Sequence, residues 1–395
     1  MSNFNIKDNQ ISSNNSYKTA KEKFIKEDYS EAINFCKKLI DNQSCDYRVY
    51  NLLANKLMDE KKYKEAEIYL GLSIKREPKI ALSYLNLANV MKSLNYPFTS
   101  VVSNYEKAIN LKPNFSDAIL FYAFYLQSNS FFEDALKNYS LLNIPIAFEK
   151  RLECLYYLND KILLSNYIEF LDKEMPCNQN VACMVNFIKK QIKIKSIYNF
   201  CPEPFKYLKI ENIKNYFSEN YFEDLIKDTN SIKILEQEGN TATRLGKQSI
   251  NTLFNYKCDS ISRLKKILEL KINDYKNSFS NSNCRFIESF PSQLKFNSWF
   301  VDLQKDGYQL PHIHMNGWLS GVFYPEDVPE SSSEYGYIKF SLRAFDMPEK
   351  KAYTSKTHRP KKGDLVLFPS CLTHSTIPNN NSDQRLSIAF DAVAN

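Results

Sequence analysis

Histidine is scarce in this chain: its 395 residues include only four, together with eight glycines and two tryptophans. So little glycine excludes collagen-like and glycine-rich low-complexity chains. The nine cysteines form no C-x-x-C pair, which argues against zinc ribbons and disulfide frameworks and predicts free thiols in a reduced, cytoplasmic protein. No segment approaches the roughly 20 apolar residues that span a membrane, and the polar start MSNFNIKDNQISSNN lacks the apolar core of a signal peptide. We therefore expect no membrane partner.

The remaining composition is that of an ordinary globular protein, 43% hydrophobic and 25% charged, and long enough for two domains. Lysine and arginine exceed aspartate and glutamate by seven (52 − 45), but the charges are scattered through mixed-sign segments. No basic block suggests a nucleic-acid partner, so none is expected.

A repeat of about 34 residues follows an Asn- and Ser-rich start, 1–15, that we expect to be disordered. The motif Tyr-x-Glu-Ala ending at Ala32 returns at Ala66, and a second alanine recurs at Ala54, Ala88 and Ala123. A small residue at this period lets paired helices approach closely. Residues 16–150 resemble tetratricopeptide repeats, which implies an α-solenoid that binds a protein or peptide in its groove. Residues 151–200 stay helical without the repeat and are expected to cap or link it.

The character of the chain changes after the break at Cys201-Pro-Glu-Pro204, our predicted domain boundary. Residues 210–226 and 261–279 have helical spacing. Short β-branched or aromatic runs, separated by turn residues, then predict antiparallel strands in a sandwich or barrel. These predicted strands are 285–290, 294–303, 309–314, 319–324, 336–342, 364–368 and 385–393.

Three of the four histidines fall within these predicted strands and the turn after one of them. His312 and His314 are two apart, so an extended chain directs both rings to one side. His374 follows the apolar run LVLFP at 365–369. Imidazole is a good ligand for iron, zinc, copper or nickel, and three imidazoles leave coordination positions open. The pattern predicts a catalytic metal centre.

A basic strand follows the third histidine. Arg385 and Ser387 share a strand face, and a guanidinium beside a hydroxyl suits a carboxylate held near the metal. Tyr324, at the end of another predicted strand, could add a hydrogen bond. These three residues are the predicted binding site for an acidic cosubstrate.

Four ordered motifs carry a family resemblance: HIH at 312–314, GWLSGVFY at 317–324, GDLVLFPSCLTH at 363–374 and QRLSIAFD at 384–391. They resemble the Fe(II)- and 2-oxoglutarate-dependent oxygenases, in a bacterial and phage branch often fused to tetratricopeptide repeats. The resemblance, over about 201–395, implies a double-stranded β-helix of the jelly-roll or cupin type with supporting helices. It also implies Fe(II), 2-oxoglutarate and O2 as cofactor and cosubstrates, and a dioxygenase that is a hydroxylase. His312, His314 and His374 match its iron ligands, and Arg385 matches its cosubstrate-binding residue.

One departure leaves alternatives open. His314 stands where the family's metal-binding triad has Asp or Glu, so Asn316, Asp302 or Asp306 could contribute, or His314 could point away. A catalytically degenerate scaffold built around the repeats, and a three-histidine dioxygenase that uses no 2-oxoglutarate, are the alternative functions. The substrate stays open among peptides, sugars, nucleotides and small metabolites.

Overall fold

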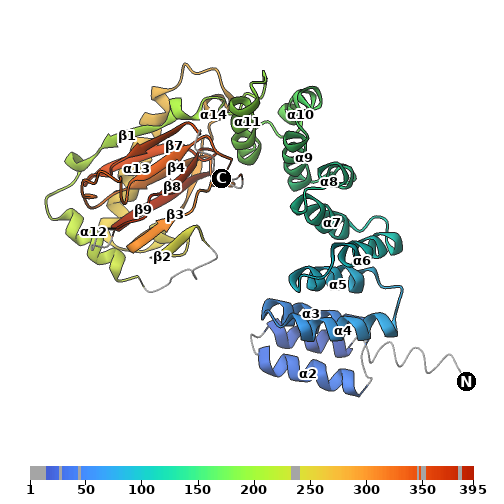
Figure 1. Ribbon diagram of the computed structural model, residues 1–395. Coiled ribbons are helices and arrows are strands. Elements are labelled where there is room, and N and C mark those ends of the chain that lie inside the picture. The colour runs from blue at the N-terminus through green and yellow to red at the C-terminus, as the bar shows by residue number, and fades with distance from the viewer. Residues whose placement is uncertain are drawn as a thin grey trace, which may run out of the picture. The chain divides into compact units, whose positions relative to one another are not determined.

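The computed structural model describes residues 15–25, 29–42, 46–232, 241–344, 347, 353–380 and 385–395. The expected disordered start, except its last residue, lies outside the described residues. By its internal contacts the chain divides after Leu158 into two compact units. Figure 1 shows helices alone in the first unit and a sheet with flanking helices in the second.

The first unit is a succession of paired helices, as the repeat predicts. Three pairs have the same turn between their two helices. In each turn, the second residue after the first helix has a positive φ: Lys61 (60°), Asn95 (56°) and Ser130 (66°). The next amide then donates to a carbonyl five residues back, at 2.7, 3.0 and 2.9 Å. This is the Schellman arrangement that ends an α-helix. The helices are α2 (Tyr29–Asp41), α3 (Tyr47–Asp59), α4 (Tyr63–Arg76), α5 (Ala81–Ser93), α6 (Phe98–Leu111), α7 (Ser116–Ser128), α8 (Phe132–Ser140) and α9 (Pro145–Leu158).

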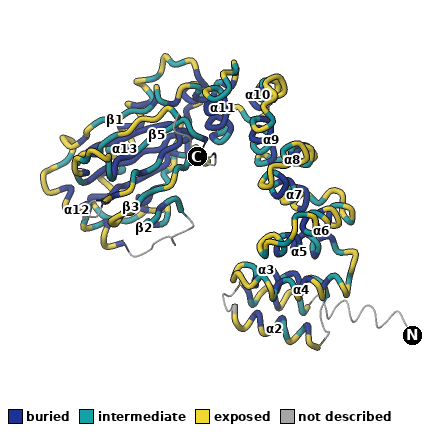
Figure 2. The backbone as a smooth tube through the Cα atoms, viewed as in Figure 1, coloured by how far each residue is buried: buried dark blue, intermediate teal, exposed yellow. Residues whose placement is uncertain are grey.

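The recurring alanines lie where these helices touch. Ala54, Ala88 and Ala123 are all 0% exposed. Figure 2 shows the buried stripe that runs through the helices of this unit. A larger side chain at these points would push the helix axes apart, which explains the period of about 34 residues. The predicted helical repeats are confirmed.

The second unit contains two antiparallel sheets. One has six strands in the order β1-β7-β4-β9-β3-β2, and the other has three in the order β6-β5-β8. The strands are β1 (Lys209–Asn212), β2 (Thr243–Gln248), β3 (Leu294–Gln309), β4 (Leu319–Phe323), β5 (Ile338–Ser341), β6 (Ser355–His358), β7 (Asp364–Pro369), β8 (Thr373–Thr376) and β9 (Arg385–Ala394). The helices of this unit are α10 (Lys161–Glu174), α11 (Gln179–Ile192), α12 (Tyr221–Asn230), α13 (Asp259–Ser278) and α14 (Arg285–Glu288). The predicted fold class, helical repeats followed by antiparallel β-structure, is confirmed.

Three local predictions are wrong. The strand expected over 309–314 is absent, because β3 ends at Gln309 and the following segment forms only an isolated bridge, between His312 and His374. The single helix expected over 210–226 is instead strand β1, a short 3-10 turn and the start of α12. β1 pairs with β7, about 150 residues away, and that remote partner outweighs the local helical spacing. The strand expected over 285–290 is the short helix α14, whose Phe286 is 0% exposed. The helix predicted over 261–279 is confirmed as α13.

The division after Leu158 falls earlier than the boundary expected at 201–204. Helices α10 and α11, expected to cap or link the repeats, belong to the second unit. Asp172 on α10 accepts two hydrogen bonds from the Arg285 guanidinium, at 2.5 and 2.7 Å. On α11, Asn186 donates to the Cys201 carbonyl at 2.9 Å. Among the described residues, no helix is both long and apolar enough to cross a bilayer.

Candidate metal centre

Hydrogen bonds between backbones bring the three histidines together. After β3 ends at Gln309, the extended chain runs beside β8, and His312 and His374 exchange two backbone hydrogen bonds of 3.0 Å each. Two residues later, the His314 amide donates to the Ser370 carbonyl at 3.1 Å. Because this antiparallel bridge fixes both segments, the side chains of His312 and His374, 62 residues apart in the sequence, lie side by side.

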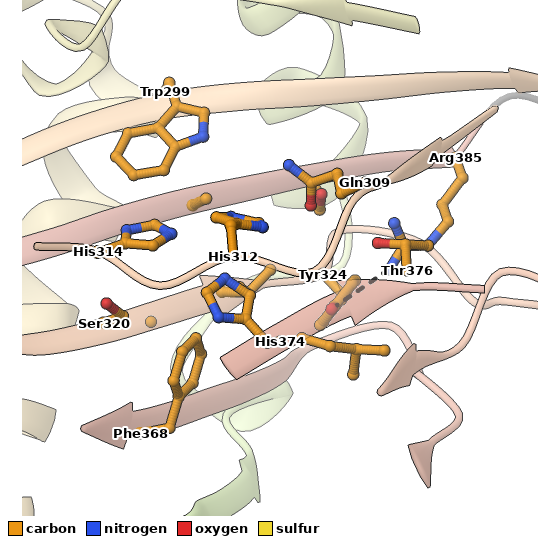
Figure 3. A pocket seen from close by; sticks show the side chains of 15 residues that line it. Trp299, Gln309, His312, His314, Ser320, Tyr324, Phe368, His374, Thr376 and Arg385 are labelled. Carbon is orange, nitrogen blue, oxygen red and sulfur yellow. Dashed lines mark hydrogen bonds between the residues drawn. The ribbon is translucent and has the colours of Figure 1, made fainter. Parts of the chain in front are cut away.

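The imidazole rings form a compact group. Ring centroids are 4.2 Å apart for His312 and His374, 4.9 Å for His314 and His374, and 5.1 Å for His312 and His314. One ring nitrogen from each lies within 4.8 Å of the others. Nitrogens that share a cation at about 2.1 Å lie at most about 4.2 Å apart, so small movements of the rings would complete a shell. Figure 3 shows the three rings grouped at one end of the pocket.

Each ring is held through its Nδ1 atom. His312 Nδ1 lies 2.7 Å from the Leu310 carbonyl, and His374 Nδ1 lies 3.2 Å from the Leu372 carbonyl. A carbonyl only accepts, so these Nδ1 atoms carry the proton and leave Nε2 with a lone pair. Metal-binding histidines in proteins are typically fixed in this manner.

The surroundings keep two of these rings neutral. Burial and the neighbouring His314 lower the pKa of His312 to about 4. Burial, with both other histidines, holds the pKa of His374 well below its usual range. Only a neutral imidazole offers a lone pair to a cation, so the site is prepared for a metal near neutral pH.

His314 has a partner that the sequence did not suggest. Its Nδ1 lies 2.6 and 2.7 Å from the two carboxylate oxygens of Asp391, on β9. The Trp299 ring stacks on the His314 imidazole, with centroids 5.4 Å apart and planes inclined by 27°. Arg385, Ser387 and Asp391 are separated by even numbers of residues along β9, so their side chains point to the same face of the strand. The presence of an acidic residue on the face that carries Arg385 is the sequence signal that could have indicated Asp391 as a site residue.

The predicted basic residue lies in the same pocket. Arg385 is 6% exposed, its Nη2 donates to the Tyr324 hydroxyl at 3.3 Å, and its guanidinium lies 5.2 Å from the centre of that ring. Its Nε has no hydrogen-bond partner among the described residues. Burial lowers the pKa of Arg385, although Tyr324 opposes the shift. An arginine remains charged in proteins, and no carboxylate in the part of the chain that the structure describes forms an ion pair with this buried cation.

The other proposed binding residues differ in position. Ser387 lines the pocket and lies 3.5 Å from the Val301 carbonyl. The three possible substitutes for the missing carboxylate ligand, Asn316, Asp302 and Asp306, do not line it. Asp302 neighbours two β3 residues, Val301 and Leu303, that pair with Ser387 and Arg385, so its side chain points to the opposite face of the sheet.

The comparisons with known proteins agree with this geometry. Residues 297–391 match a family model described as "Putative 2OG-Fe(II) oxygenase". The match contains all three clustered histidines, together with Arg385 and Asp391. No curated protein sequence matches the chain. The predicted combination of helical repeats with a segment of this oxygenase type is confirmed.

Solved structures resemble parts of the chain. A tetratricopeptide repeat protein from Parabacteroides merdae superposes with a TM-score of 0.40 and 13% identity, over 46% of this chain and 74% of its own. A prolyl-4-hydroxylase from Pseudomonas putida superposes with a TM-score of 0.35 and 12% identity, over 48% of this chain and 92% of its own.

The residues present fit a divalent metal and an acidic cosubstrate. Three Nε2 lone pairs form a donor set that first-row metals accept, and they leave positions open. The buried guanidinium of Arg385, whose Nε has no hydrogen-bond partner among the described residues, lines the same pocket. A closed structural metal site has no need of such a buried cation.

Proposed function

We propose that this protein is an Fe(II)- and 2-oxoglutarate-dependent dioxygenase that hydroxylates its substrate. The observation that carries the proposal is the coincidence, in one pocket, of three convergent imidazoles and a buried arginine that forms no ion pair with any described residue. The family match over 297–391 supports it independently.

In this proposal, His312, His314 and His374 hold the iron through Nε2, and their Nδ1 hydrogen bonds fix the ring orientations. When bound, iron and 2-oxoglutarate supply the oxidising power through oxidative decarboxylation of the ketoacid by O2. The chain's remaining task is to orient the cosubstrate and exclude water.

Arg385, Tyr324 and Ser387 would receive the carboxylate of 2-oxoglutarate that lies away from the metal. The guanidinium can form two parallel charge-assisted hydrogen bonds, and the Tyr324 hydroxyl, which accepts from Arg385, keeps its own proton to donate. Phe368 packs edge-on against His374, with ring centroids 4.7 Å apart, and the Trp299 ring stacks on His314. These aromatic rings make the wall of the pocket apolar.

The helical repeats would recruit a protein or peptide substrate. Solenoids of paired helices present extended concave surfaces that suit such partners. This part of the proposal is tested by incubating peptide arrays with the full chain, iron and 2-oxoglutarate, and by looking for a mass gain of one oxygen atom. Failure of every peptide, with oxidation of small molecules instead, would contradict it.

The oxygenase proposal is tested by anaerobic titration with Fe(II) and 2-oxoglutarate, followed by measurement of succinate after O2 is admitted. We expect His312→Ala and His374→Ala to lose iron binding and succinate formation. His358→Ala is the matched control, because the fourth histidine bonds Asp364 at 2.9 Å and does not line the pocket. A wild-type protein that binds no iron and forms no succinate would refute the proposal and favour a non-catalytic scaffold. Full activity of the variants at 312 and 374 would refute the assignment of these histidines as iron ligands. Succinate-independent activity that survives Arg385→Ala would favour a three-histidine dioxygenase without 2-oxoglutarate.

A further inference from the structure

We propose that Asp391 is a positioning residue. Its carboxylate, hydrogen-bonded to His314, orients that ring and places beside it the negative charge that the three imidazoles themselves lack. The inference rests on the proposed function and goes beyond it, because it assigns a role to a carboxylate that is not itself a metal ligand. The usual triad of this type places a carboxylate directly on the iron. Here an imidazole occupies that position, and the carboxylate stands behind it.

The first argument is placement. One nitrogen from each histidine belongs to the ligand cluster, whereas the Asp391 carboxylate does not, among the described residues. Both of its oxygens instead lie within 2.7 Å of His314 Nδ1, on the far side of the ring from the free Nε2. A carboxylate only accepts when ionised, so His314 donates through Nδ1 and directs its lone pair into the pocket.

The second argument is that the carboxylate itself is held in place. The Ser320 hydroxyl donates to Asp391 Oδ1 at 2.7 Å, and the Ser370 hydroxyl lies 2.8 Å from that of Ser320. Ser320 and Asp391 are also direct partners in the pairing of β4 with β9. A side chain at Gly317 would come within 2.5 Å of the Ser370 hydroxyl and 3.1 Å of Asp391, so only glycine fits there. The anion therefore has little freedom to leave the imidazole.

The third argument concerns charge. Three neutral imidazoles would leave the full charge of a divalent cation in a buried site, where charge is costly. The Nδ1 atoms of His312 and His374 bond to backbone carbonyls, which are neutral. Among the residues that the structure describes, His314 is the one of the three rings that bonds a carboxylate. A carboxylate behind a histidine raises the basicity of that ligand, and loss of such a partner typically weakens metal binding about 10- to 100-fold.

The test uses Co(II) as the probe, because its binding and visible absorption can be measured without turnover. Asp391→Asn keeps an oxygen that can accept from His314 but removes the charge. We expect its dissociation constant for Co(II) to rise about 10- to 100-fold, with a changed absorption spectrum. Asp364→Asn is the matched control: it alters the other His–Asp pair of the second unit, at His358, and should leave Co(II) affinity unchanged.

A double-mutant cycle separates positioning from general structural support. In a His314→Ala background, Asp391→Asn should cause no further loss of Co(II) affinity, because its effect passes through that ring. The inference would be overturned if Asp391→Asn bound Co(II) as tightly as the wild type. It would also be overturned if Asp391→Asn lowered the Co(II) affinity of the His314→Ala variant as much as it lowers that of the wild type. Wild-type protein that binds no Co(II) or Fe(II) would instead count against the proposed function. The thermal melting of both metal-free Asn variants shows whether they fold like the wild type.

Discussion

Replacement of Arg385 by methionine should affect binding and stability in opposite directions. Arg385 is buried, its Nε is unpaired, and no carboxylate among the described residues forms an ion pair with it. Methionine retains much of the apolar stem but removes the charge. We therefore expect Arg385→Met to lose 2-oxoglutarate binding while the ligand-free protein becomes more stable.

The magnitudes follow from the contacts. Removing one partner of a buried charge pair costs about 2–5 kcal/mol of binding free energy, which is roughly 30- to 4000-fold in the dissociation constant. An unsatisfied buried donor costs the fold about 1–3 kcal/mol. The long hydrogen bond and the ring contact with Tyr324 offset about 0.5–2 kcal/mol of this cost. The net gain in stability is about 1 kcal/mol, or about 2–4 °C in the melting temperature of a unit this size.

Calorimetric titration of the Co(II)-loaded protein with 2-oxoglutarate, without O2, measures the first effect. Thermal melting without ligand measures the second. Arg359→Met is the matched control, because this guanidinium has ordinary partners, the Val328 carbonyl and the Glu330 carboxylate, each at 2.9 Å. It should leave 2-oxoglutarate affinity unchanged and should not raise the melting temperature. A lower melting temperature and unchanged affinity in Arg385→Met would show that the guanidinium is structural.

Three other outcomes are expected. Proton NMR of the metal-free protein, with only four histidines to assign, should show His312 titrating near its pKa of about 4, and a titration near 6.5 would contradict this. Because the unfolded chain binds this proton at higher pH, the free energy of unfolding should fall as pH drops from about 6.5 towards 4. The hydrogen bonds from Arg285 lower the pKa of Asp172, so Arg285→Gln should cost about 1.5–3 kcal/mol of unfolding free energy at neutral pH. This loss should shrink as pH falls below about 3.9. Urea unfolding followed by tryptophan fluorescence measures it, because both tryptophans lie in the second unit. Ala88→Leu should destabilise the first unit by about 1–3 kcal/mol, seen by circular dichroism, and leave Co(II) affinity unchanged; a shared loss would mean that the repeats support the metal site.

Some features of this protein could be read from the sequence because their signals are local or periodic. The buried alanines recur with the helix pairs, so spacing alone predicted the repeats. The helix over 261–279 has a long apolar stripe, and most strands of the main sheet are short runs between turn residues. His312 and His314 share a side of the chain because of the period of an extended strand. The proposed roles of His374 and Arg385 came from residue type and from motifs in a fixed order.

Tertiary structure decided the features that depend on a remote partner. Residues 209–212 form a strand because β7 lies beside them, although the local spacing favours a helix. Asp391 was missed because its partner, His314, is 77 residues away. Strand alternation places it on the face of Arg385, but only the packing of β9 beside β4 and the 310–318 segment shows which side chain it meets. The sequence alone therefore determined which residues could form a metal site, and the pairing of distant strands decided which of them meet and which carboxylate lies beside His314.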